Sequence, residues 1–194
     1  AEREEANRKN VAIIRAIERG LEGFAFLDKD GCFTYMNPVH AAIYGYKPDE
    51  LIGQSWKTLH TPEWVSRIEH DYFSILLKVG HWTGLVQGRT QSGGQIYTEV
   101  SLVLAEQPYD PARWLTCTCR DVTKRVTSRE KLETHLASLD QAQAIAHVGS
   151  WEWDIETGAE IWSDEQFRIF GYEPGTIAPT IETFRAAVHP GDRA

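Results

Sequence analysis

One short pattern occurs twice in this chain and sets the scale on which the chain folds. Residues 37–56 read NPVHAAIYGYKPDELIGQSW, and residues 163–184 read SDEQFRIFGYEPGTIAPTIETF. Both stretches carry a short helix, a Gly-Tyr pair and an X-Pro turn, about 126 residues apart. Domains commonly hold about 50 to 250 residues, so this separation is that of neighbouring domains. The repeat therefore predicts two copies of one domain-sized unit.

The size and charge of the chain restrict what these units could bind. Its 194 residues are 42% hydrophobic, enough for one complete core and part of a second. The 20 Lys and Arg against 28 Asp and Glu give a net charge of -8, and the basic residues are scattered. Nucleic acid is not expected as a partner, because phosphate contacts need clustered basic residues.

The apolar runs and the cysteines indicate whether this segment contacts a membrane and in which compartment it is found. No apolar run approaches the roughly 20 residues that span a bilayer, and no signal peptide opens the chain. We therefore expect no membrane contact in this segment, while the parent protein could be anchored elsewhere. The cysteines Cys32, Cys117 and Cys119 have neither zinc nor redox spacing, which favours a reducing, cytoplasmic setting. A chain that begins without Met is expected to be a piece of something longer.

The pattern of elements in the first unit begins with a hairpin and short helices. Residues 23–36 form two strand-like runs around the turn sequence DKDG. Asn37 and Pro38 are typical of a helix start, and Gly45 of a helix end. A second helical turn is expected at 48–51, stopped by Gly53.

A longer helix and three strands complete the unit. The helix is predicted from residue 61 or 62 to about 78, closed by Gly80. Residues 82–107 predict a hairpin around the sequence SGG, and residues 113–122 a last strand. The order of elements predicts an α+β fold of about 100 residues, with a five-stranded antiparallel sheet and helices on one face.

Two helices are expected outside this unit. Residues 4–18 carry a narrow apolar stripe, which could pack on its own domain or pair with another chain. After residue 122 a second stripe follows a 4-3-4 spacing, typical of a coiled coil, in a predicted connector helix at 123–147. Together they predict a homodimer through the N-terminal and connector helices. The stripe of the connector consists of Leu132, Leu136, Leu139, Gln143 and Ala146.

The ordered motifs resemble the PAS domain family. GFAFLDKDGCFTYMNPVHAAIYGYKPDELIGQSW is similar to the amino-terminal half of a PAS domain, and GHWTGLVQGRTQSGGQIYTEVSLVLAEQ to its sheet half. CRDVTKR resembles the Asp-x-Thr ending that leads into a signalling helix. The expected organisation is an N-terminal helix at 1–19, a PAS domain at 20–122, the connector at 123–147 and the opening part of a second PAS domain at 148–194.

The resemblance also bears on cofactors, because this chain lacks residues that some cofactor-binding PAS domains need. The flavin-adduct type of PAS domain needs Gly-x-Asn-Cys-Arg where this chain has GQSWKTL, so adduct photochemistry is not expected. A haem PAS needs a His on or after the long helix, and the residues flanking His70 and His81 do not resemble that type. Trp82 in GHWTG is compatible with a PAS that binds flavin dinucleotide, but Trp is also common there in PAS units that bind nothing known. The cofactor therefore remains open.

Candidate functional residues follow from strand alternation. Eight residues are expected to face the helices across the sheet, where they form either a plain core or a pocket for a small molecule. No catalytic constellation can be assembled from Asp28, Asp30, His60 and His70, and no metal pattern is present, so this segment is not expected to be an enzyme. The eight residues are Trp82, Val86, Thr98, Val100, Leu102, Leu115, Cys117 and Cys119.

A second candidate site lies where the sheet meets the connector. Asp121 ends the last predicted strand and Thr123 begins the helix, where Thr could be an ordinary N-cap. The family resemblance implies that this junction couples the sheet to the helix. The leading hypothesis is a sensory module of a signalling protein of the histidine kinase or diguanylate cyclase type. The rival hypothesis is a ligand-free dimerisation or scaffolding module.

Overall fold

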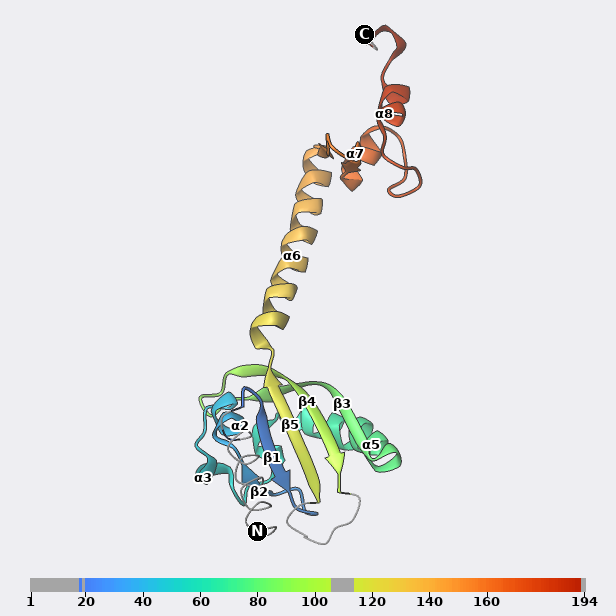
Figure 1. The fold of residues 1–194 in the computed structure, drawn as a ribbon. Helices are drawn as coiled ribbons and strands as arrows, with labels where there is room; N and C mark the ends of the chain where they lie inside the picture. Colours follow the sequence, from blue (N-terminus) through green and yellow to red (C-terminus); the bar gives the residue numbers. More distant parts are fainter. Residues whose placement is uncertain (1–17, 19, 106–113, 193–194) are drawn as a thin grey trace, which may run out of the picture. The chain divides into compact units, whose positions relative to one another are not determined.

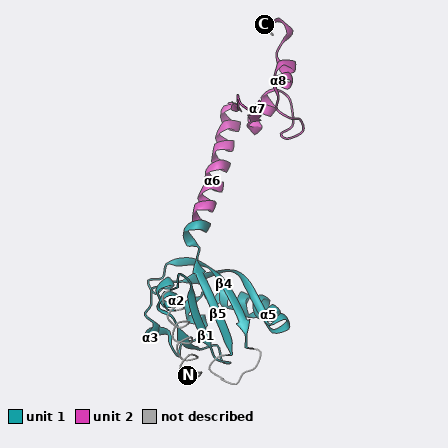
Figure 2. Ribbon diagram, in the orientation of Figure 1, with its two compact units in different colours: residues 1–126 teal, residues 127–194 magenta. Residues whose placement is uncertain are grey.

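The computed structural model describes residues 18, 20–105 and 114–192, and it divides the chain into two compact units, 1–126 and 127–194 (Figure 2). The expected amphipathic helix at 4–18 lies, but for its last residue, outside the described residues. Of the second unit, the described part holds two short strands, β6 (Trp151–Trp153) and β7 (Glu160–Trp162), and two short helices, α7 (Asp164–Ile169) and α8 (Ile181–Ala187), followed by the 3-10 turn η4 (Pro190–Asp192).

The sheet of the first unit has five antiparallel strands in the order β2-β1-β5-β4-β3 (Figure 1). This confirms the predicted fold class. The first and last strands in sequence meet at the centre, where Ala25 of β1 pairs with Cys117 of β5. The strands are β1 (Gly23–Leu27), β2 (Phe33–Met36), β3 (His81–Arg89), β4 (Gln95–Leu104) and β5 (Leu115–Asp121).

Turn chemistry sets the path between the strands and helices. The Asp28 side chain accepts hydrogen bonds from the backbone N–H groups of Asp30 and Cys32, both at 2.9 Å, which fixes the β1–β2 turn. Asn37 caps α2 (Pro38–Ile43) by accepting from the N–H of His40 at 2.9 Å. The short α3 (Pro48–Leu51) and the 3-10 turn η1 (Trp56–Leu59) follow.

The predicted long helix is present but contains a π-helical turn. α4 (Pro62–Arg67) runs through η2 (Ile68–Tyr72) into α5 (Phe73–Val79), and Gly80 ends the helix with a φ of 85°. The extra residue explains why the inward apolar positions Ile68 and Phe73 are five apart. That step is the sequence signal for the π turn. Leu77, expected among the apolar positions of this helix, is exposed.

The core lies between the helices and one face of the sheet. Strand alternation is as predicted, since Thr98, Val100 and Leu102 on β4 are buried and Glu99 between them is exposed. Cys117 and Cys119 on β5 share the buried face. The connector helix is α6 (Thr123–Ala146), one residue shorter than expected, and its three leucines are exposed.

Candidate functional site

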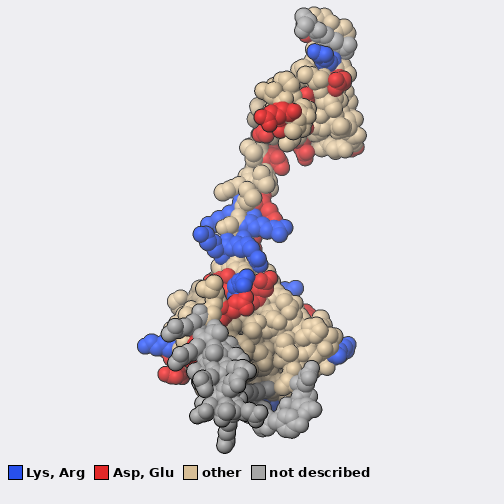
Figure 3. Space-filling view, in the orientation of Figure 1, with Lys and Arg blue, Asp and Glu red and all other residues tan. Residues whose placement is uncertain are grey.

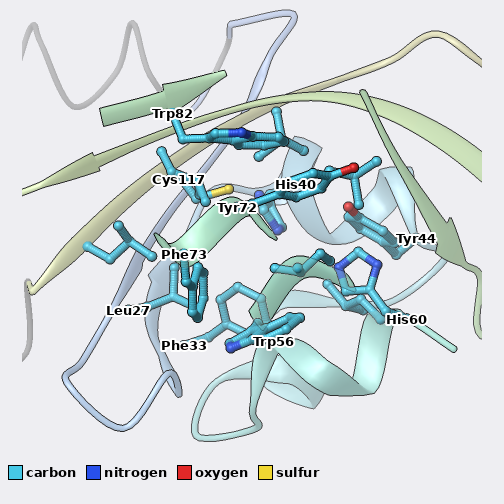
Figure 4. Close-up of a pocket in the computed structure, with 16 residues that line it drawn as sticks. Leu27, Phe33, His40, Tyr44, Trp56, His60, Tyr72, Phe73, Trp82 and Cys117 are labelled. Atoms are coloured by element: carbon cyan, nitrogen blue, oxygen red, sulfur yellow. The ribbon is translucent and has the colours of Figure 1, made fainter. Parts of the chain in front are cut away.

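A small cavity of about 60 Å³ lies inside the first unit, between the helices and the sheet (Figure 4). Six of the eight predicted pocket residues line it. The remaining predicted pair, Thr98 and Cys119, lie behind the wall, where each contacts a residue that does line it. The six residues are Trp82, Val86, Val100, Leu102, Leu115 and Cys117.

The helices supply much of the rest of the cavity wall. The alternation of residues along the strands could not predict these side chains. Two of these residues, His40 of α2 and His60 after η1, carry imidazoles. His40 stands three residues after the helix cap Asn37, and with Ala41 it is buried while Pro38 and Ala42 are exposed. The helical and hairpin side chains are Leu27, Phe33, His40, Tyr44, Trp56, Leu59, His60, Ile68, Tyr72 and Phe73.

Aromatic contacts shape one side of the cavity. The ring of Tyr72 stacks on the indole of Trp82, with centroids 4.3 Å apart and planes 19° apart. Trp82 lies against Gly84, where an added Cβ would be 2.5 Å from the indole ring. The missing side chain of Gly84 lets the indole lie close to the backbone of β3. The π turn and this glycine together position the stacked pair.

His40 is the most unusual polar group of the wall. It is 2% exposed, and its Nδ1 lies 3.3 Å from the Sγ of Cys119. Its Nε2 has no hydrogen-bond partner among the described residues. Burial, and to a lesser degree the charge of His60, lowers the pKa of His40 to about 4, so the ring is neutral at pH 7.

The other titratable groups of the wall are also held neutral. Burial lowers the pKa of His60, whose Nδ1 lies 3.0 Å from the backbone oxygen of Gln87. Burial raises the pKa of Cys117 to about 12 and also raises the pKa values of Cys119 and Tyr44. Both thiols of β5 therefore remain protonated at pH 7, which makes them poor nucleophiles.

A hydrogen-bonded path leads from the cavity to the connector helix. The hydroxyl of Tyr44, in the cavity wall, is 3.3 Å from the hydroxyl of Thr98 on β4. The neighbouring residue Tyr97 donates its N–H to the Thr123 hydroxyl at 2.9 Å, and its carbonyl accepts from Val122 N–H at 2.9 Å. The predicted pair Asp121 and Thr123 thus lies at the end of this path.

The junction itself is tightly bonded. Asp121 accepts a hydrogen bond from the N–H of Thr123 at 2.8 Å, and the Thr123 hydroxyl also donates to the Tyr97 carbonyl at 3.4 Å. One turn later, Arg125 forms a salt bridge with Glu99 of β4 at 3.6 Å. The helix start is therefore joined to β4 as well as to β5. The Thr123 hydroxyl bonds the start of the helix to Tyr97 of β4.

The volume of the cavity bears on the cofactors that the sequence left open. Sites for drug-sized ligands hold about 300 to 1,000 Å³, several times the 60 Å³ present here. A flavin or haem ring system does not fit this cavity without movement of the wall. Among the described residues, no group of three or more His, Cys, Asp or Glu side chains is placed to hold a metal ion. No helix in the described ranges combines the length and apolarity needed to cross a bilayer.

The structure is a small α+β fold, with a five-stranded antiparallel sheet in this strand order, short helices over one face and an internal cavity. A sequence profile for the PAS domain matches residues 21–124, more than half of the chain. The protein belongs to the PAS domain family.

Solved structures agree with the fold. A PAS domain from Colwellia psychrerythraea is 23% identical, with a TM-score of 0.54 over 58% of this chain and 96% of that one. An RNA-binding Light-Oxygen-Voltage receptor is 22% identical, with a TM-score of 0.53 over 69% of this chain and 38% of that one. At these identities the likeness concerns the fold alone.

Two curated proteins are similar in sequence. The probable diguanylate cyclase DgcE of Escherichia coli (strain K12) is 18% identical over all of this chain. The nitrogen fixation regulatory protein of Klebsiella pneumoniae is 19% identical over 64% of it. The chain spans only 18% of the first relative's length and 25% of the second's.

Proposed function

We propose that this chain is a sensory module of a signal-transduction protein, in which the state of the cavity is relayed to the connector helix α6. The observation that carries the proposal is the path from Tyr44 through Thr98 and Tyr97 to Thr123. A change in the cavity wall that moves Tyr44 alters the position of β4 at the residue that holds the helix. Such a relay needs only a modest difference between two arrangements of the junction.

The similarity to DgcE and to the nitrogen fixation regulatory protein supports an output domain of the cyclase or kinase type in the parent protein. The ligand, redox state or partner that sets the signal would act on the cavity of the first unit. This segment itself would perform no catalysis.

We also propose that residues 148–194 begin a second PAS domain. Bonds around Asn37 recur 126 positions later around Ser163: Phe24 N–H to the Asn37 side chain at 2.9 Å, and Ser150 N–H to the Ser163 hydroxyl at 3.0 Å. After the following helix, the N–H of Tyr46 bonds the carbonyl of residue 41, and the N–H of Tyr172 that of residue 167. A shared network, and not only a shared motif, supports a tandem arrangement.

The relay is tested by Thr123→Val, which keeps the side-chain shape and removes the hydroxyl. Losing a hydrogen bond of this kind typically costs about 1 kcal/mol, so amide hydrogen exchange in the first turn of α6 is expected to be about five-fold faster. Thr134→Val is the matched control, because Thr134 bonds only within α6, to the carbonyl of Glu130. Unchanged exchange in Thr123→Val would contradict the relay.

A second candidate function is dimerisation or scaffolding without a ligand. The observation that favours it is the exposed stripe of Leu132, Leu136 and Leu139 on α6, at the spacing of a coiled-coil seam. The expected occupant is a second copy of this chain. Sedimentation should show a dimer that Leu136→Lys dissociates and Lys131→Ala leaves intact. A wild-type protein that stays monomeric at high concentration would remove this candidate.

A further inference from the structure

His40 Nε2 is a hydrogen-bonding atom without a partner in a cavity wall. In folded proteins nearly all buried polar atoms have a partner, and an exception indicates a missing water, ion or ligand. His40 lines the cavity together with Tyr44, Tyr72 and Cys117 (Figure 4). The ring is fixed from both sides by Phe33, with centroids 5.5 Å apart, and Tyr44, at 5.7 Å. A nitrogen atom held in place in this way is suited to orienting a bound ligand.

The contact with Cys119 decides which hydrogen bond Nε2 can make. Cys119 is protonated, because burial raises its pKa, so its S–H can donate to Nδ1 across the 3.3 Å separation. A thiol donating to an imidazole nitrogen uses a good acceptor, whereas the reverse arrangement would use the weak acceptor sulfur. The hydrogen of the neutral ring then resides on Nε2. Nε2 therefore acts as a donor and requires an acceptor.

The rest of the cavity wall determines which charge a ligand can carry. The described residues that line the cavity include no Lys, Arg, Asp or Glu, and both imidazoles are neutral. An ion placed among apolar and aromatic side chains would lose its hydration without a compensating charge. A charged ligand is therefore disfavoured.

The size of the cavity limits the guest further. An engineered cavity of about 150 Å³ holds benzene, with its six carbons. A volume of about 60 Å³ is less than half of this, so the ligand is expected to be smaller than benzene. The wall is otherwise apolar, so the guest is expected to carry one polar group on a hydrocarbon body.

We infer that the cavity takes a small, uncharged organic molecule whose oxygen accepts a hydrogen bond from Nε2–H of His40, such as a short ketone, aldehyde, ether or alcohol. The inference rests on the proposed sensory function, since it names the class of ligand for the same cavity. Within this class, His40 is the specificity-determining residue, because no other fully buried side-chain nitrogen or oxygen of the described residues is left without a partner.

The test uses the full chain, with acetone as the probe and 2-methylpropene as the control of the same shape without an oxygen. Binding is followed by NMR titration in the millimolar range. His40→Leu should bind acetone about three- to ten-fold more weakly, the value of one hydrogen bond, and 2-methylpropene unchanged. His40→Gln, which can place an amide N–H near the position of Nε2, should recover most of the acetone affinity.

A second measurement does not depend on any variant folding. A long-range proton–nitrogen correlation spectrum of the wild-type histidines identifies which ring nitrogen of His40 carries the hydrogen. The inference expects Nε2 protonated, with its signal shifting as acetone is added. A hydrogen on Nδ1 would overturn it. So would acetone binding equally to wild type and His40→Leu.

Failure of this inference is distinguishable from failure of the proposed relay. If acetone binds without His40 but Thr123→Val still loosens the first turn of α6, the ligand class is wrong and the relay stands. If acetone binds through His40 but Thr123→Val has no effect, the cavity is a binding site without the proposed connection to the helix.

Discussion

The buried His40 makes the stability of the first unit depend on pH. Its pKa is about 4 in the folded protein, against 6.5 for a free imidazole. Between these values the unfolded chain binds a proton that the folded protein does not, so stability falls as the pH falls through this window. Above about pH 6.5 the His40 imidazole is neutral in both the folded and the unfolded chain, and its contribution to the pH dependence of stability disappears.

The magnitude follows from the two pKa values. From pH 6.5 to pH 5 the cost grows by about 1.4 kcal/mol per pH unit, which gives about 2 kcal/mol at pH 5. Near pH 4 it approaches its limit of about 3 kcal/mol. A loss of 2 kcal/mol is a large part of the 5 to 15 kcal/mol or so that holds a typical domain folded.

The assay is urea unfolding of the full chain at pH 7 and pH 5, for wild type and for His40→Gln, which does not titrate. The pH-dependent loss is expected to be about 2 kcal/mol smaller in His40→Gln than in wild type. His70→Gln, at an exposed position on the π turn, is the matched control and should behave as wild type does. An equal loss in wild type and His40→Gln would refute the burial of a neutral His40.

Two further predictions concern packing and reactivity. Gly84→Ala should destabilise the first unit by about 1 to 3 kcal/mol, because the new methyl group displaces the indole of Trp82; Gly94→Ala, which meets the Thr90 hydroxyl at 3.1 Å, should cost less in the same thermal melt. In the native protein, iodoacetamide should modify the partly exposed Cys32 well before the two buried cysteines of β5. Mass analysis of the labelled peptides checks this, and equal labelling of all three would contradict the buried, protonated state of the β5 thiols.

Basic and acidic side chains lie close together on part of the surface. In the face shown in Figure 3, basic side chains occur together on α6, next to acidic ones, and elsewhere they are dispersed. Arg129 pairs with Glu133 one turn along α6, at 2.8 Å. The charges of Arg129 and Glu133 therefore partly neutralise each other.

Much of the fold was predictable from the sequence because its signals are local. The DKDG turn, the Asn37 cap and the alternation along β4 each depend on residues a few positions apart, and all three are present. The sheet half of the cavity followed from the same alternation. These features need no knowledge of distant contacts.

The helical half of the cavity could not be predicted in the same way. His40 lies inward because α2 packs on β1 and β5, and its partner Cys119 is 79 positions away. The apolar pattern around the π turn is that of an ordinary helix. The five-residue step from Ile68 to Phe73 is the one sequence feature that indicates the turn. Thr123 was placed at the right junction, but its bond to Tyr97 depends on strand register, which local patterns do not determine.

The measurement that tests the relay most directly is a double-mutant cycle between Tyr44→Phe and Thr123→Val, read by amide hydrogen exchange in the first turn of α6. Tyr44→Phe removes the hydroxyl that contacts Thr98, while Thr123→Val removes the bond to Tyr97. If the cavity and the helix are coupled, the two effects will differ from additivity by about 0.5 kcal/mol or more. Strict additivity, with Tyr44→Phe leaving exchange in α6 unchanged, would contradict the proposal that the cavity controls the connector.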